Sequence, residues 1–169
     1  MNVLYVVLAV AAAGMVSGAG LASAEIPEVV KIGGIFEYNW AEGAEGAIIS
    51  EMAVEDFNTY LENIGAGWSF HLSAEDTQSS GAVSFEKVQA FNGAGVKMLV
   101  GLPFSQYISQ AASYIDRNNM LVISHASQSA NLAIDDTVFR LVPNDSYQAP
   151  AITKMLEDAG IRYHRWPAT

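Results

Sequence analysis

"VKMLVGLPFSQYISQAASYIDRNNMLVIS", residues 96–124, contains two apolar runs separated by an amphipathic segment. The run VKMLVG is short and apolar, as expected of a buried strand. In FSQYISQAASYI, apolar residues recur at i, i+3, i+4 and i+7, which predicts a helix that buries one face. NNMLVIS then supplies a second strand. This strand, helix and strand predict two parallel strands joined by a right-handed crossover.

The same alternation extends over the rest of the chain from Val29. The last helix is expected to be capped by Asp145 or Ser146 and to end at Gly160. Regular alternation predicts the α/β class, an open and mostly parallel sheet with helices on both faces, in a Rossmann- or flavodoxin-like order. The other expected elements are the strand VVKIGGIF (29–36), a helix at 42–63, the strand WSFHLSAED (68–76), a helix at 81–91, the strand TVFRLV (137–142) and the last helix at 145–160.

The composition bounds the functions that are open to the chain. Its 169 residues, 51% hydrophobic and 15% charged, are typical of one globular domain. The net charge of -10 comes from 18 acids against 8 bases, which opposes binding to nucleic acid. Cysteine is absent, so disulfides and thiolate chemistry are excluded. His71 and His125 lack neighbours of metal-ligand type, and we predict neither a metal nor a cofactor.

Residues 1–24 read as a secretory signal peptide. They carry no charged side chain, and an apolar run is followed by Gly, Ser and Ala. Ala22 and Ala24 form an A-x-A cleavage pattern, with Glu25 as the first mature residue. The alternative is an uncleaved membrane anchor. Under either interpretation the domain expected at 25–169 lies outside the cytoplasm, in the periplasm or on the extracellular face of the membrane.

Ligands of open parallel sheets bind outside the carboxyl ends of the strands, where helix N-termini present free N–H groups. Here those ends are followed by GLPFSQ (101–106) and SHASQS (124–129), and the first of these lies in a stretch, Met98 to Ile115, that contains no charged residue. Hydroxyls, amides and N–H groups can hold a carboxylate, so the sequence predicts a neutral mouth that suits a zwitterion. The residues expected to converge there are Ser105, Gln106, Ser127, Gln128 and Ser129.

Each further candidate has a second interpretation. Ser105 can cap the helix that it begins instead of contacting a ligand. Tyr38 and Trp40, in the loop after the first strand, can cover the apolar part of a ligand or pack on their own loop. His125 is a ligand contact or a packed loop residue. Asp76 is expected to order the turn after the second strand through an Asx-type bond.

The ordered set of motifs resembles the type I periplasmic solute-binding proteins of ABC transporters, in the branched-chain amino acid (leucine-binding protein-like) family. The resemblance covers Val29 to Gly160, and it implies that Ser105 and Ser127–Ser129 bind the α-carboxylate and α-ammonium groups of a ligand. Members have two lobes, so this chain would hold most of the N-terminal lobe. The motifs are VKIGGIF, EMAVEDFN, EDTQSSGAVSFEKVQAF, VKMLVGLPFS, MLVISHASQSANL and VFRLVPNDSYQAPAITKML.

Departures from the family pattern leave the solute open. Ser124-His125 stands where Ser-Pro is common, and the loop EYNWAEGAEG lacks the usual Leu-Ser/Thr-Gly. The resemblance implies a non-enzymatic transport component that binds an amino acid or similar small zwitterion in a cleft, closes two lobes by a hinge and docks on a membrane permease. One lobe is expected to bind weakly or not at all, and to aggregate through its exposed apolar edge.

Two other function classes remain open from the sequence. The ligand-binding half of an extracellular sensor or receptor shares this fold. An exported α/β enzyme is the third class, but a hydrolase of this fold would need a G-x-S-x-G nucleophile elbow, and that motif is absent. We therefore expect no catalytic residues.

Overall fold

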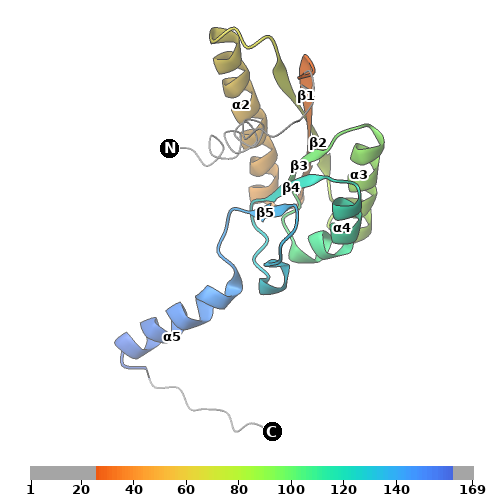
Figure 1. The fold of residues 1–169 in the computed structure, drawn as a ribbon. Coiled ribbons are helices and arrows are strands. Elements are labelled where there is room, and N and C mark those ends of the chain that lie inside the picture. Colours follow the sequence, from red (N-terminus) through yellow and green to blue (C-terminus); the bar gives the residue numbers. More distant parts are fainter. Residues whose placement is uncertain (1–25, 162–169) are drawn as a thin grey trace.

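The computed structural model describes residues 26–161, so the predicted signal peptide and its cleavage site lie outside the described residues. Within this range the chain forms a five-stranded sheet of order β2-β1-β3-β4-β5, in which every pair of neighbours is parallel. The elements are β1 (Val29–Phe36), α2 (Ala41–Asn63), β2 (Ser69–Asp76), α3 (Gly81–Gly93), β3 (Met98–Gly101), α4 (Ser105–Arg117), β4 (Leu121–Ser124), η1 (Ala130–Leu132), β5 (Val138–Arg140), η2 (Asp145–Tyr147) and α5 (Gln148–Asp158) (Figure 1).

The predicted fold class is confirmed, and β1 has the predicted bounds. The other four strands are shorter than expected. WSFHLSAED begins at Ser69, VKMLVG at Met98 and NNMLVIS at Leu121, and TVFRLV contributes only Val138–Arg140. The shortening of β5 has a topological reason, because β5 ends the sheet and has a strand on one side alone.

The two faces of the sheet are covered unequally. Leu99 and Val122 join the larger core with the buried faces of α3 and α4. Val100 and Ile32 point the other way and pack with residues of α2 in a smaller cluster. Because successive side chains of a strand alternate between faces, one short strand such as β3 serves both clusters. This alternation accounts for helices on both faces, as predicted.

The chain after β5 differs from the predicted single helix at 145–160. It begins as the short turn η2, in which the Asn144 side chain accepts a hydrogen bond from the Ser146 N–H at 3.0 Å. α5 follows with Tyr147 at its N-cap and no side-chain cap, so the prediction of Asp145 or Ser146 as the cap of this helix is wrong. Gly160, with φ of +71°, ends the helix as predicted.

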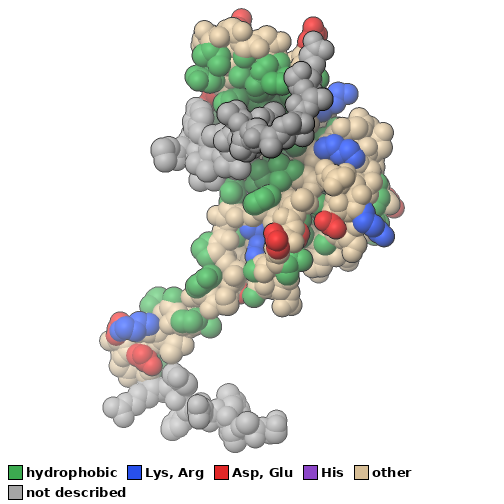
Figure 2. All heavy atoms as spheres, viewed as in Figure 1, with side chains coloured by type: hydrophobic (Ala, Val, Ile, Leu, Met, Phe, Trp, Pro, Cys, Tyr) green, Lys and Arg blue, Asp and Glu red, His purple; other side chains and the backbone are tan. Residues whose placement is uncertain are grey.

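α5 stands away from the sheet and buries none of its residues (Figure 1). The α2 face of the sheet is therefore partly open, and a groove of about 350 Å³ runs between α2 and the strands, with Ile49, Val100, Ile123 and Leu141 in its lining. Figure 2 shows hydrophobic side chains gathered over α2 and along α5. Within residues 26–161, no helix combines the length and the hydropathy needed to cross a membrane.

Candidate functional site: the start of α4

The site forms where β3 and β4, which are neighbours in the sheet, end at the same edge. β3 leaves the sheet through a tight turn in which Gly101 and Leu102 have φ of +110° and +48°. A Cβ at residue 101 would lie 2.1 Å from the carbonyl oxygen of Ile35, so only glycine fits there. The turn brings Ser105, the first residue of α4, against the loop that follows β4.

Ser105 does not cap α4, and that alternative is wrong. Phe104 occupies the N-cap without a side-chain bond. The Oγ of Ser105 lies 2.9 Å from the Oγ of Ser127 and accepts a hydrogen bond from the Ser129 N–H at 3.1 Å. The first N–H groups of a helix have no intrahelical acceptor. Among residues 26–161, the N–H groups of Ser105 and Gln106 also have no acceptor elsewhere.

A buried hydroxyl holds the two loops together beneath this point. The Ser124 Oγ donates to the carbonyl of Leu102 at 3.0 Å and accepts from the Ser127 N–H at 3.2 Å. Ser124 and Ser127 are both buried. The β4 loop is therefore fixed against the turn that leads into α4, and the hydroxyls of Ser105 and Ser127 are preorganised with respect to each other.

Two open cavities flank the start of α4. A cavity of about 510 Å³ extends over the β4 loop, and one of about 430 Å³ lies on the other side of Ser105. Trp40 and Phe104 line both, and their rings meet edge to face with centroids 4.9 Å apart. Neither lining contains Lys or Arg, and the smaller cavity is lined by no charged residue. The larger cavity is also lined by Glu37, Glu42 and Asp145, so the expectation of a neutral mouth is wrong there. A carboxylate bound at the start of α4 would meet hydroxyls, amides and the positive end of the α4 dipole.

The structure brings most of the predicted site residues to these cavities. The residues at the larger cavity are Trp40, Ser105, His125, Gln128 and Ser129, and Gln106 joins Trp40 and Ser105 at the smaller one.

Two predicted residues do not line either cavity. Ser127 is buried, and its hydroxyl is hydrogen bonded to that of Ser105 but is not part of either lining. Tyr38 is exposed, and its N–H donates to the Asp76 carboxylate at 3.1 Å. The same Asp76 oxygen accepts from the Gln78 N–H at 3.0 Å, which confirms the predicted Asx-type turn.

His125 separates the larger cavity from the apolar groove beside α2, because it lines both. Its ring lies 6.2 Å from that of Phe36, between centroids. Burial lowers the pKa of His125 below the ordinary value of 6.5, which favours the neutral imidazole at neutral pH. Over residues 26–161, no group of three His, Cys, Asp or Glu side chains is placed to hold a metal ion.

Sequence reasoning missed a polar cluster next to the site. Glu37, directly after β1, is buried, and its carboxylate accepts hydrogen bonds from Thr77 and Ser79 in the loop after β2. Glu37 lines the larger cavity, as do Glu42 and Asp145, which were also not predicted. An acid at the end of a buried apolar strand was the available signal for Glu37, because such a residue must find hydrogen-bond donors.

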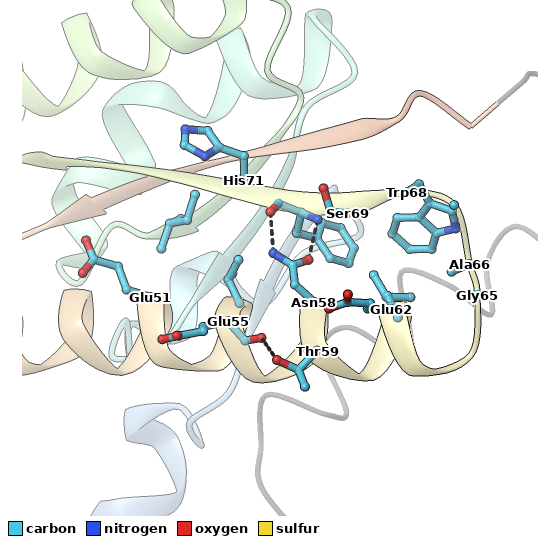
Figure 3. Close-up of a pocket in the computed structure, with 15 residues that line it drawn as sticks. Glu51, Glu55, Asn58, Thr59, Glu62, Gly65, Ala66, Trp68, Ser69 and His71 are labelled. Carbon is cyan, nitrogen blue, oxygen red and sulfur yellow. Dashed lines mark hydrogen bonds between the residues drawn. The ribbon is translucent and has the colours of Figure 1, made fainter.

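A larger open groove of about 820 Å³ lies elsewhere, between α2 and the edge strand β2 (Figure 3). There the Asn58 side chain donates to the Phe70 carbonyl at 2.8 Å and accepts from the Phe70 N–H at 2.7 Å. The amide thus takes the place of a neighbouring strand at the edge of the sheet. His71 is exposed beside this groove, as predicted for a surface residue. The lining of this groove comes from α2, β2 and the turn between them, at the place where the helix packs on the edge strand.

Several known proteins are similar to this chain. An ABC transporter substrate-binding protein from Desulfitobacterium hafniense, solved in complex with Leu, is 25% identical with a TM-score of 0.64, over 79% of this chain and 40% of that one. The leucine-binding protein LivK from Thermotoga maritima is 21% identical with a TM-score of 0.64, over 78% and 38%. The uncharacterized protein MJ1266 of Methanocaldococcus jannaschii is 28% identical over 121 residues, which are 68% of this chain and 29% of that protein.

The chain spans less than half the length of these relatives. The family described as the receptor family ligand binding region matches residues 50–164, which is more than half of the chain. The parallel sheet, the helices on its two faces and the solved relatives agree with this match. The chain therefore belongs to the receptor family ligand binding region, and its fold is that of the type I periplasmic binding proteins.

Proposed function

We propose that this chain is the N-terminal lobe of an exported solute-binding component of an ABC transporter, and that it binds the carboxylate of an amino acid or similar small zwitterion at the start of α4. The observation that carries the proposal is the uncapped N-terminus of α4, where the Ser105 hydroxyl and two free N–H groups lie together. Such a helix end attracts anions, and cavities without basic side chains leave the N–H groups available.

The surroundings of this helix end support a zwitterion over a simple anion. Glu42 and Asp145 line the larger cavity and can attract an ammonium group. The edge-to-face pair of Trp40 and Phe104 offers an apolar wall to a side chain. The complex of the Desulfitobacterium hafniense protein with Leu is in accord with this ligand class. Trp40 and His125 are then contacts of the ligand, together with Gln106, Gln128 and Ser129.

We infer that one lobe supplies only half of the cleft. In the two-lobed arrangement a hinge closes the second lobe on the ligand, and the closed form docks on a membrane permease. Binding to this chain alone is then weak, because the contacts from the second lobe are missing. Export agrees with the signal-like character of residues 1–24, and we propose that residues 25–169 form the mature part.

Saturation-transfer NMR detects weak binding and therefore suits this test. The purified chain is mixed with a panel of amino acids and with amines that match them but lack the carboxylate. We expect saturation transfer to amino acids and none to the amines. Ser105→Ala should abolish it. Ser109→Ala, which removes an exposed hydroxyl one turn further along α4, is the matched control and should preserve it. Equal transfer to the amines, or no effect of Ser105→Ala, would overturn the proposal.

A second function fits the same site. The matching family is described as a receptor ligand-binding region, so the lobe can also belong to an extracellular sensor. Both functions use the same carboxylate site and differ in what the ligand-bound form contacts. Pull-down of a membrane permease by the two-lobed protein favours transport, and failure to bind one favours the sensor.

A further inference from the structure

The larger cavity is lined by a buried carboxylate, that of Glu37, whose two oxygens are both engaged with hydroxyl groups of the chain. Glu37 is only 1% exposed. Its Oε2 accepts from the Thr77 hydroxyl at 2.5 Å, and its Oε1 accepts from the Ser79 hydroxyl at 2.7 Å. Burial raises the pKa of Tyr107, on α4, and the adjacent Glu37 carboxylate raises it further. Glu37 therefore accepts from two hydroxyl groups of the loop that follows β2.

No cation compensates Glu37 within the part of the chain that the structure describes. The salt bridges there join Lys87 to Glu75 and Lys154 to Asp158. Burying an acid without a cationic partner costs free energy, and hydroxyl donors recover only part of it. An apolar residue would fill the same space without that cost. Stability therefore does not explain why a carboxylate is buried at residue 37. The conformation that it holds in the neighbouring loops is the better explanation.

The geometry that Glu37 imposes is strained. Gln78 and Ser79, in the loop after β2, have φ of +51° and +53°, a region that residues other than glycine seldom adopt. Such residues persist where the surroundings hold them. Ser79 is held by its bond to Glu37, and it also accepts from the Asn39 side chain at 3.0 Å. The loops after β1 and β2 are therefore tied to each other.

Trp40 connects the loop that contains Glu37 to the ligand site. Trp40 follows Glu37 by three residues, and its N–H donates to the Glu37 carbonyl at 3.4 Å. Its ring contacts Phe104, the N-cap residue of α4, and lines both cavities with Ser105. At the next turn Gly43 approaches so closely that an added Cβ would lie 1.9 Å from the Glu37 carbonyl oxygen. A shift of Glu37 would therefore move the wall of the site.

We propose that Glu37 is a positioning residue: through Thr77 and Ser79 it fixes the loop that holds the Trp40 ring against Phe104 over the start of α4. The consequence for ligand affinity rests on the proposed function, whereas the position of Trp40 does not. Although Glu37 lines the larger cavity, its two carboxylate oxygens accept from Thr77 and Ser79, and we assign it a role in positioning the loop. Its loss should free the Trp40 ring while leaving the sheet intact.

Tryptophan fluorescence tests the position of Trp40 without any ligand. The other two tryptophans, Trp68 and Trp166, are changed to Phe in the full chain, which leaves Trp40 as the reporter. In this background Glu37→Gln keeps the size of the side chain and removes its charge. We expect a red shift of the Trp40 emission and increased quenching by acrylamide. Glu55→Gln, which changes an exposed acid on α2, is the matched control and should cause neither effect.

Two further measurements separate positioning from simple support of the fold. Thr77→Val removes one donor to Glu37 and should reproduce part of the change in Trp40, whereas far-ultraviolet circular dichroism should stay as in the parent. If urea unfolding shifts in Glu37→Gln but the Trp40 emission and quenching do not, Glu37 supports the fold alone and the inference is overturned. Where amino acid binding is measurable, Glu37→Gln should weaken it. If none is measurable, the proposed function fails while the fluorescence result still decides this inference.

Discussion

The hydroxyl oxygen of Ser105 lies 2.9 Å from that of Ser127, although the two residues follow different strands of the sheet. Ser105 begins α4, and Ser127 lies in the loop that follows β4. Their contact links the segments that follow the C-terminal ends of β3 and β4, where we place the ligand. It depends on Ser124, which holds the Leu102 carbonyl with its hydroxyl and accepts from the Ser127 N–H.

Ser124→Ala should therefore destabilise the chain and loosen the site. The change leaves the Leu102 carbonyl and the Ser127 N–H without their buried partner, and each such loss costs about 1–3 kcal/mol. Urea unfolding measures the effect, with the exposed Ser109→Ala as the control. An unfolding free energy equal to that of the parent would contradict the role given to Ser124.

Acidification should lower stability through His125. Burial lowers the pKa of His125 in the folded chain, so the unfolded chain takes up the proton first as the pH falls through about 6.5. The free energy of unfolding then decreases until the pH passes below the pKa of the folded chain. Urea unfolding at pH 7.5 and at lower pH should show this loss reduced in His125→Gln. His71→Gln, which removes an exposed imidazole, is the control, and an equal slope in His125→Gln and the parent would refute the assignment.

Asn58→Ala should be among the more destabilising changes of a polar residue on α2. The Asn58 amide satisfies both the N–H and the carbonyl of Phe70 at the edge of the sheet (Figure 3). Their loss costs about 1–3 kcal/mol for each group left unpaired. Thr59→Ala, which removes an exposed hydroxyl bond to Glu55, should change stability by less than about 0.5 kcal/mol. Thermal unfolding compares the two variants, and similar effects would contradict the edge-capping role.

The open apolar groove should make the chain self-associate as its concentration rises. Ile49, which lines the groove on α2, is 61% exposed. Exposed apolar surface of this kind favours association. Static light scattering should show a mass that increases with concentration and that Ile49→Lys reduces. Ile134→Lys is the control, because Ile134 is 62% exposed but lies outside the groove lining. A parent that stays monomeric would refute this prediction.

The sequence predicted the layers of the fold well because local patterns dominate there. The 3.6-residue periodicity of α4 corresponds to its buried residues Tyr107, Ile108, Ala111 and Ile115. The β-branched run of β1 corresponds to a strand with the predicted bounds. Periodicity reports which side of an element is buried, and burial decides these elements.

The side-chain partners could not be predicted in the same way. Serine at the start of a helix favours a cap, but Ser105 bonds to Ser127 and Ser129, which are distant in sequence. The cluster around Glu37 joins residues about 40 positions apart, and nothing local distinguishes Thr77 or Ser79 as its donors. Such contacts depend on how the loops meet, which alternation of strands and helices leaves undetermined.

The most direct test of the carboxylate site is a titration of the isotope-labelled chain with leucine, followed through its backbone amide resonances. If the half-site contributes a binding free energy of about 4 kcal/mol, the Kd is near 1 mM, and such a titration detects binding of this strength. We predict that the amides of Ser105, Gln106 and Ser129 shift most, that Ser105→Ala abolishes these shifts, and that isoamylamine, which lacks the carboxylate, does not cause them. Shifts centred elsewhere, or the same shifts with isoamylamine, would contradict this prediction.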